Sequence, residues 1–164
     1  MTATADFETW ATGRYSTLLH AAFLLTGDRD TAQDLVQTAL AKTQVAWRRV
    51  HTSPDAYVRR VMVTTRTDWW RRQTWREENS AAISEIGAFD AGHNRVEERD
   101  ALLQLLQTLP SRMRTVIVLR YYLQMPEAEV AGLLGCSIGS VKSTASRGLQ
   151  RLRSHPILAS KELN

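Results

Sequence analysis

The sequence predicts an all-α fold in two small helical domains, and three observations carry this prediction. Apolar residues recur at helical spacing almost throughout, and there is no alternating run bounded by hairpin turns. Residues 77–93 break that pattern with acidic and small side chains. The chain has 164 residues and is 43% hydrophobic, which is enough for two small packed cores. We therefore expect helical domains at residues 5–76 and 95–156, joined by a flexible acidic linker at residues 77–94.

The first domain is expected to contain three helices. A helix at residues 6–25 ends at Thr26-Gly27, and either Asp28 or Asp30 can cap a second helix that continues to about residue 50. After a loop at residues 51–55, a third helix spans residues 56–76. The apolar stripes expected to form the core are Phe7, Trp10, Tyr15, Leu18, Ala22 and Leu25 on the first helix, and Leu35, Val36, Ala39, Leu40, Trp47 and Val50 on the second.

The third helix carries tryptophans among arginines. An exposed Trp70 would suit stacking on an unpaired base while cations hold the phosphates. The alternative is that Trp69 and Trp70 both belong to the core; the pattern favours this for Trp69 and leaves Trp70 open. One face is expected to hold Val58, Val61, Met62, Thr65 and Trp69, and the opposite face Arg60, Val63, Thr64, Thr67, Trp70, Arg71 and Thr74.

In the second domain the helical pattern resumes near residue 95 and ends at Leu109-Pro110. Ser111 is expected to cap a helix that reaches about residue 123. Two short helices follow, the first with Pro126 at its first position, and a tight Gly135-Cys136-Ser137 turn joins them. His155-Pro156 closes the ordered part. This pattern is typical of a helix-turn-helix, whose second helix enters the major groove of duplex DNA.

The second helix of this motif is amphipathic. Ser137 suits its N-cap, because the hydroxyl can accept from first-turn amides. Lys142 lies nearer the apolar stripe and should reach sideways to a phosphate. The alternative is an ordinary helical hairpin whose charged side only faces water. The apolar stripe is expected to be Ile138, Val141, Ala145, Leu149 and Leu152, the base readers Ser140, Ser143, Thr144 and Arg147, and the phosphate contacts Arg151 and Arg153.

Charge is distributed in blocks. The net charge is +4, but residues 42–76 hold nine Lys/Arg against two acids, residues 77–100 hold seven acids against two Arg, and residues 112–153 hold seven Lys/Arg against two acids. Two basic blocks with interleaved aromatics favour a polyanionic partner. The four histidines lack metal-ligand spacing, and no glycine loop could cradle a phosphate, so we expect neither an enzyme nor a cofactor or metal site.

Cellular location can be addressed from the same composition. The sequence contains no run of about 18 apolar residues, so it suggests no membrane span. Its first residues also lack the pattern of a secretory signal. Cys136 is the only cysteine, which excludes an internal disulfide. We therefore expect a cytoplasmic protein.

Three stretches carry a family resemblance. Residues 30–49 resemble the core-binding helix of bacterial RNA polymerase sigma factors of the extracytoplasmic-function group. Residues 55–65 with Trp70-Arg71-Arg72 resemble the promoter-melting helix of an actinobacterial, sigma-E-like branch of that group. Residues 109–122 and the helix-turn-helix are similar to the C-terminal domain of the family. All three occur in the family's order and cover nearly the whole chain except the linker and the ends.

The resemblance implies binding to the RNA polymerase core and direction of the enzyme to promoter DNA. The C-terminal domain would read the −35 element as duplex, and the N-terminal domain would capture the −10 element as an opened strand, with the 51–55 loop pocketing an extruded base. The positions carried over are Asp34, Leu35, Gln37 and Thr38 for the polymerase; His51, Ser53, Asp55, Arg59, Arg60, Thr64, Trp70, Arg71 and Arg72 for the −10 strand; and Ser140, Lys142, Ser143, Thr144, Arg147 and Arg151 for the −35 duplex.

The sequence also departs from the family. The family often has Asn at the position of Thr64 and Arg at that of Thr144, so a bifunctional amide and a charged contact are both replaced by hydroxyls. The promoter sequences of relatives therefore cannot be transferred to this chain. The family resemblance further implies an anti-sigma factor as a partner that covers the polymerase-binding surface.

Two alternatives remain open at this point. The 34–38 face can be the solvated side of a core helix. The whole chain can be a stand-alone helix-turn-helix regulator with an effector domain at residues 1–76, which would bind a palindromic operator as a dimer.

Overall fold

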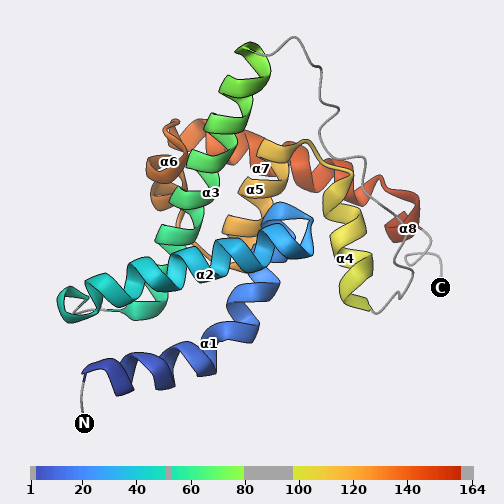
Figure 1. Ribbon diagram of the computed structural model, residues 1–164. Helices are drawn as coiled ribbons and strands as arrows, with labels where there is room; N and C mark the ends of the chain where they lie inside the picture. The colour runs from blue at the N-terminus through green and yellow to red at the C-terminus, as the bar shows by residue number, and fades with distance from the viewer. Residues whose placement is uncertain (1–2, 51–52, 80–97, 160–164) are drawn as a thin grey trace. The chain divides into compact units, whose positions relative to one another are not determined.

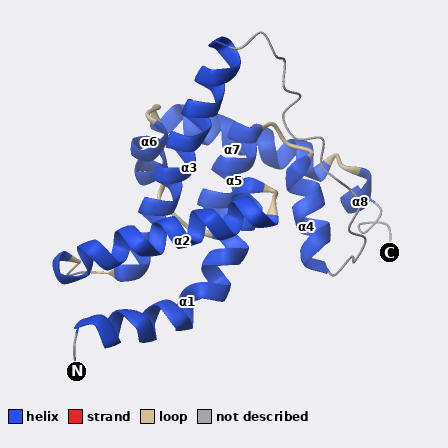
Figure 2. Cartoon of the chain, viewed as in Figure 1, coloured by secondary structure: helices blue, strands red, loops and turns tan. Residues whose placement is uncertain are grey.

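The structure is a computed structural model that describes residues 3–50, 53–79 and 98–159. Within these ranges every regular element is a helix (Figure 2), as the sequence predicts. The chain divides into two compact units, Met1–Gly92 and His93–Asn164. Of the segment predicted as a linker, residues 77–79 continue a helix and residues 80–94 lie outside the described ranges.

The first unit is built from three long helices, α1 (Ala3–Thr26), α2 (Arg29–Ala46) and α3 (Pro54–Asn79), with a short 3₁₀ turn, η1 (Trp47–Arg49), after α2 (Figure 1). Helix α2 packs against both α1 and α3. Val63 was predicted for the polar face of α3 but is fully buried, because it shares the inner stripe with Met62. The largest fully buried side chains of this unit are Leu24, Leu25, Leu35, Val36, Val58, Met62 and Val63.

The start of α2 is fixed by one side chain. Gly27 ends the preceding turn at φ 76°, a left-handed conformation that glycine adopts without strain. Asp28, and not Asp30, is the N-cap: its Oδ2 accepts from the Thr31 backbone N–H at 2.8 Å and from the Thr31 hydroxyl at 2.6 Å. These hydrogen bonds hold the pKa of Asp28 below its ordinary value of 3.8, and the bond from the Thr31 hydroxyl has the larger effect.

The second unit contains α4 (Glu98–Gln107), α5 (Ser111–Ile117), a π-helical turn η2 (Val118–Tyr122), α6 (Glu127–Leu134), α7 (Ile138–Arg153) and α8 (Pro156–Ala159). Helices α5 and α6 both pack on α7. The prediction that Ser111 caps α5 was wrong, because Pro110 holds the cap position and Ser111 is already helical. Pro126 likewise holds the cap position of α6 instead of its first helical position.

The turn of the helix-turn-helix follows the predicted chemistry. Gly135 ends α6 at φ 67°, and the Ser137 side chain accepts from the Ser140 backbone N–H at 3.0 Å, which confirms it as the N-cap of α7. Ile138 was predicted in the apolar stripe but is 46% exposed, since it precedes the first turn that contacts α5. Gly148 instead lies buried against Ile117, at a place where a larger residue would not fit.

No helix in the described ranges combines the length and apolar character needed to cross a membrane.

A first prediction concerns the cap of α2. D28A should lower the free energy of unfolding by about 1 kcal/mol at neutral pH, because two donors of the first turn lose their acceptor. Since the pKa of Asp28 is lowered by folding, this stabilisation is present above about 3.8 and is lost as the pH falls through the native pKa. Urea unfolding at a series of pH values should therefore show the gap between wild type and D28A closing in acid. D28N, which keeps an acceptor oxygen, is the control; a gap independent of pH would contradict the assignment.

A second prediction uses two glycines of the helix-turn-helix. A Cβ at Gly148 would lie 3.0 Å from Ile117 Cγ1 and 3.1 Å from its Cδ1, whereas at Gly132 it would meet nothing within 4 Å. G132A should stabilise by about 0.5–1 kcal/mol through reduced backbone entropy. G148A should destabilise by about 1 kcal/mol, because overpacking against the stiff Ile117 outweighs that gain. Thermal unfolding followed by circular dichroism measures both, and a G148A protein as stable as wild type would refute the close packing.

Candidate nucleic-acid interface

The outer face of α3 presents cations and one tryptophan to solvent. Arg60, Thr64, Arg71 and Arg72 are exposed, and Arg59 is half-buried. Trp70 is 45% exposed, which decides the question that the sequence left open, whereas Trp69 is only partly exposed. On the inner side Thr65 is buried and accepts a hydrogen bond from Lys42 Nζ at 3.1 Å. A large aromatic surface thus lies beside guanidinium groups that the core does not bury.

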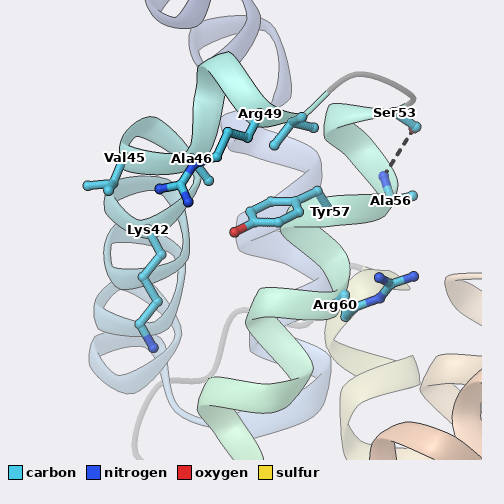
Figure 3. A pocket seen from close by; sticks show the side chains of 9 residues that line it. Lys42, Val45, Ala46, Arg49, Ser53, Ala56, Tyr57 and Arg60 are labelled. Carbon is cyan, nitrogen blue, oxygen red and sulfur yellow. Dashed lines mark hydrogen bonds between the residues drawn. The ribbon is translucent and has the colours of Figure 1, made fainter.

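A cavity of about 640 Å³ opens between the end of α2 and the start of α3. Figure 3 shows the Tyr57 ring reaching from α3 toward α2, with Lys42 on α2, Arg49 in η1 and Arg60 on α3. Such a cavity, partly apolar and edged by cations, has room for one planar base with its phosphate nearby. The lining residues are Lys42, Val45, Ala46, Arg49, Val50, Ser53, Ala56, Tyr57 and Arg60.

Of these lining residues the sequence reasoning assigned only Ser53 and Arg60 to a site, and it missed Tyr57, Arg49 and Lys42. The two walls come from helices separated by a loop, so no local periodicity links them. The one available signal was the aromatic residue one turn before Arg60 on the same face of α3.

The residues predicted to form the base-binding loop, His51, Ser53 and Asp55, differ in where the structure places them. His51 lies outside the described residues. The Ser53 hydroxyl accepts from the Ala56 backbone N–H at 3.2 Å and so closes the first turn of α3 beside the cavity (Figure 3). Asp55 accepts from Trp10 Nε1 at 3.1 Å and from Arg14 Nε at 2.8 Å, both on α1. Its carboxylate is therefore engaged by protein donors.

The face of α2 predicted to bind a partner needs one correction. Asp34 and Gln37 are exposed and Thr38 is partly exposed, so these three are accessible from solvent. Leu35 is fully buried and cannot face a partner in this structure. The reason is its position beside Val36 and one turn before Ala39, which places it on the core stripe of α2.

The recognition surface of α7 is largely as predicted. Lys142, Ser143, Arg147 and Arg151 are exposed, and Ser140 is partly exposed. Thr144 was predicted to read a base but is only 5% exposed. The buried stripe runs through Val141, Thr144, Ala145 and Gly148, which are spaced i, i+3, i+4 and i+7, so Thr144 lies on the inner face of α7.

Glu127 at the start of α6 connects the two helices of the motif. Its Oε1 lies 3.3 Å from Arg120 Nη2, and its Oε2 lies 3.8 Å from Lys142 Nζ on α7. Arg120 also donates to the Met125 carbonyl. The Glu127 carboxylate therefore pairs with Arg120, which precedes α6, and partly neutralises Lys142 on the recognition helix.

Comparison with known proteins gives two family matches and close relatives. Residues 12–76 match sigma-70 region 2 and residues 99–152 match sigma-70, region 4. The RNA polymerase sigma-E factor of Streptomyces coelicolor is 41% identical over 150 residues, which covers 90% of this chain and 84% of the relative. That of Streptomyces avermitilis is 38% identical over 161 residues, covering 97% and 88%. The chain belongs to the sigma-70 family of RNA polymerase sigma factors.

The solved structures agree on the fold. The sigma factor RpoE of Bartonella quintana, crystallised with the anti-sigma factor NepR, superposes with a TM-score of 0.67 at 23% identity and covers 90% of this chain and 94% of its own. The two region matches and the Streptomyces sigma-E relatives confirm the resemblance to the extracytoplasmic-function group, and the stand-alone regulator is not favoured, because both sigma regions occur in order. This sigma factor binds the RNA polymerase core and directs initiation at promoters; its region 2 match contains α3 and the cavity, and its region 4 match contains the helix-turn-helix.

A third prediction follows from Glu127. E127Q should strengthen binding of the holoenzyme to a promoter about two- to fivefold and steepen its salt dependence, because Lys142 becomes free to neutralise a phosphate. The exposed ion pair itself contributes little to stability. Filter binding at several salt concentrations measures both effects. In a K142Q background the same change should have little effect; an equal gain there would show that Lys142 is not the route.

Proposed function

We propose that this sigma factor, a non-catalytic cytoplasmic subunit, divides promoter recognition between its two units. Residues 5–76 bind the polymerase core and trap the opened −10 strand, residues 95–156 grip the −35 duplex, and residues 77–94 tether them. The observation that carries the proposal is the cavity beside Tyr57, which continues into the exposed cationic face of α3.

Geometry along α3 supports the −10 assignment. Arg60, Thr64 and Arg71 recur at helical spacing and share one face of α3, with Trp70 at its edge. The distance along the helix from Tyr57 to Trp70 is roughly 20 Å, the length of about six stacked nucleotides of one strand. A base in the cavity and a second base on Trp70 would hold the ends of that stretch, and the arginines would meet its phosphates. The residues that we assign to this strand are Tyr57, Arg59, Arg60, Thr64, Trp70, Arg71 and Arg72, with His51 and Ser53 at the loop.

The exposed side of α7 supports the −35 assignment. The N-cap at Ser137 leaves the first turn of α7 projecting from the motif, which is the part of a recognition helix that reads bases. Ser140 and Ser143 offer hydroxyls there, and Arg147 can reach a base or a phosphate. Lys142 and Arg151 flank them for phosphate contacts. Thr144 is excluded from this set by its burial.

We assign one accessible face of α2 to the polymerase core. It is formed by Asp34, Gln37 and Thr38. The same surface would be available to an anti-sigma factor, the kind of partner present in the Bartonella quintana complex. A protein that covered this face would prevent core binding without covering the outer face of α3 or the recognition surface of α7.

Each unit by itself offers few phosphate contacts, so free protein should bind DNA weakly, and added salt should weaken that binding further. Attachment of both units to polymerase makes the second contact intramolecular and raises the overall affinity without any new contact. The primary test is transcription with purified core polymerase on genomic fragments, followed by start-site mapping. Specific initiation is expected only when the chain is added, and nanomolar, sequence-specific binding by the free protein would contradict the proposal.

A fourth prediction tests Trp70 on a promoter mapped in that way. W70A should reduce opening of the −10 region about tenfold, because one base–aromatic stack contributes about 1–3 kcal/mol. W70F keeps an aromatic face and should remain close to wild type. Permanganate reactivity of unpaired thymines measures opening, and affinity for the core serves as the control. Equal opening by W70A and wild type would remove Trp70 from the strand path.

A further inference from the structure

One indole, that of Trp10, contacts both η1 and the first turn of α3. The ring of Trp10 packs on that of Trp47 in η1, with centroids 5.2 Å apart, and Phe7 packs on both. On the other side of the loop, Trp10 Nε1 donates to Asp55 Oδ1 at 3.1 Å. The position of α3's first turn relative to η1 is therefore held by a side chain of α1.

Asp55 is committed to this contact. Its Oδ1 also accepts from Arg14 Nε at 2.8 Å, so two donors on α1 converge on one oxygen. Ser53 and Ala56, on either side of Asp55 in sequence, line the cavity, while Asp55 itself does not. The chain here presents neighbouring residues to the cavity and the carboxylate to α1.

We propose that Asp55 is a positioning residue. Its contacts with Trp10 and Arg14 form a set of three residues that we call the α1 strap, and this strap sets the base preference of the cavity. This rests on the proposed function of the cavity as the site of an extruded −10 base. The wall on α3 carries Ser53, Ala56 and Tyr57, and the opposite wall carries Ala46, Arg49 and Val50 next to Trp47. Because Trp10 contacts both sides, loss of its N–H bond lets the walls shift relative to each other.

Discrimination between bases is sensitive to such shifts. A site must be held within about 0.5 Å of its productive geometry for its polar groups to select a ligand. The strap holds the walls through a partly buried indole donor, whereas the Arg14–Asp55 pair is half exposed and contributes less. Trp10 also precedes residue 12, where the region 2 match begins, so a contact from outside the matched segment controls a site within it.

The competing reading is that the Asp55 carboxylate contacts the base itself, and conservative variants separate the two. D55N keeps an oxygen that can accept from Trp10 but replaces the other acceptor with a donor. W10F keeps the ring that packs on Phe7 and Trp47 but removes the donor. D55A removes the whole contact, and R14Q removes only the exposed one.

The experiment uses holoenzyme on a mapped promoter whose −10 positions are randomised, each −10 variant being linked to its own tag in the transcribed region. Sequencing the tags in the run-off transcripts then reports which −10 bases are used. W10F and D55A should each lower the preference for the favoured base about three- to tenfold, the range expected for one lost hydrogen bond. The W10F/D55A double variant should be no worse than either alone, R14Q should shift the preference in the same direction by less, and D55N should keep most of it. Core affinity should stay unchanged. T12A is the matched control, because the Thr12 hydroxyl bonds only to the Glu8 carbonyl of its own helix.

The proposal is overturned if D55N loses the preference as fully as D55A while W10F and R14Q retain it, since Asp55 would then read the base directly. Should W10F fail to fold, the comparison of D55A, D55N and R14Q decides the matter alone. A different failure is recognisable in wild type: if holoenzyme initiates but shows no −10 base preference, the assignment of the cavity is wrong whatever the strap does.

Discussion

The contact on which region 2 of this protein depends is the meeting of Trp10 with Trp47 and Asp55. Helices α2 and α3 pack side by side through their buried stripes, and Trp10 adds contacts to η1 after α2 and to the first turn of α3. The indole satisfies its N–H on a carboxylate and buries its ring against a second aromatic, so it holds both helix ends at once. The cavity edged by Tyr57 and Arg49 lies between the two ends that this side chain holds. A long-range contact thereby shapes a local binding surface.

Region 4 achieves its geometry by local means. Gly135 takes a left-handed conformation, Ser137 caps the next helix, and Gly148 allows α5 to approach α7 until only hydrogen would fit. The first two devices act through the backbone within a few residues, whereas Gly148 acts on the packing of α5 against α7. A surface that reads rigid duplex benefits from this, because the recognition helix must project at a fixed angle. In the division of labour that we propose, the first unit instead accepts an unstacked strand, which would adapt to a cavity whose walls come from separate helices.

This difference explains how much of the molecule the sequence could predict. The caps at Asp28 and Ser137, the Gly135 turn and the helical periods are local, and the structure confirms them within a few residues. The helical pattern assigned Val63 and Thr144 outward, but both are buried; Leu35, which the pattern placed in the core stripe, was carried outward only by the family resemblance. A turn of about 100° per residue leaves such positions to be decided by the neighbouring helix. The partners of Asp55 lie 41 and 45 residues away, and no local pattern encodes contacts at that separation.

The placement of charge completes the argument for a protein that works only as part of a larger enzyme. Region 2 and region 4 each expose a few cations on one helix face, and Glu127 partly neutralises one of them. Because every neutralised phosphate releases a counterion, binding energy grows with the number of such contacts. With few contacts, either unit alone would dissociate readily from any DNA sequence. Polymerase adds a third attachment that contributes no sequence information but raises the effective concentration of both units at a promoter. Weak binding by each unit is then an advantage, because the enzyme would remain only at a promoter that binds both units, one as duplex and the other as an opened strand.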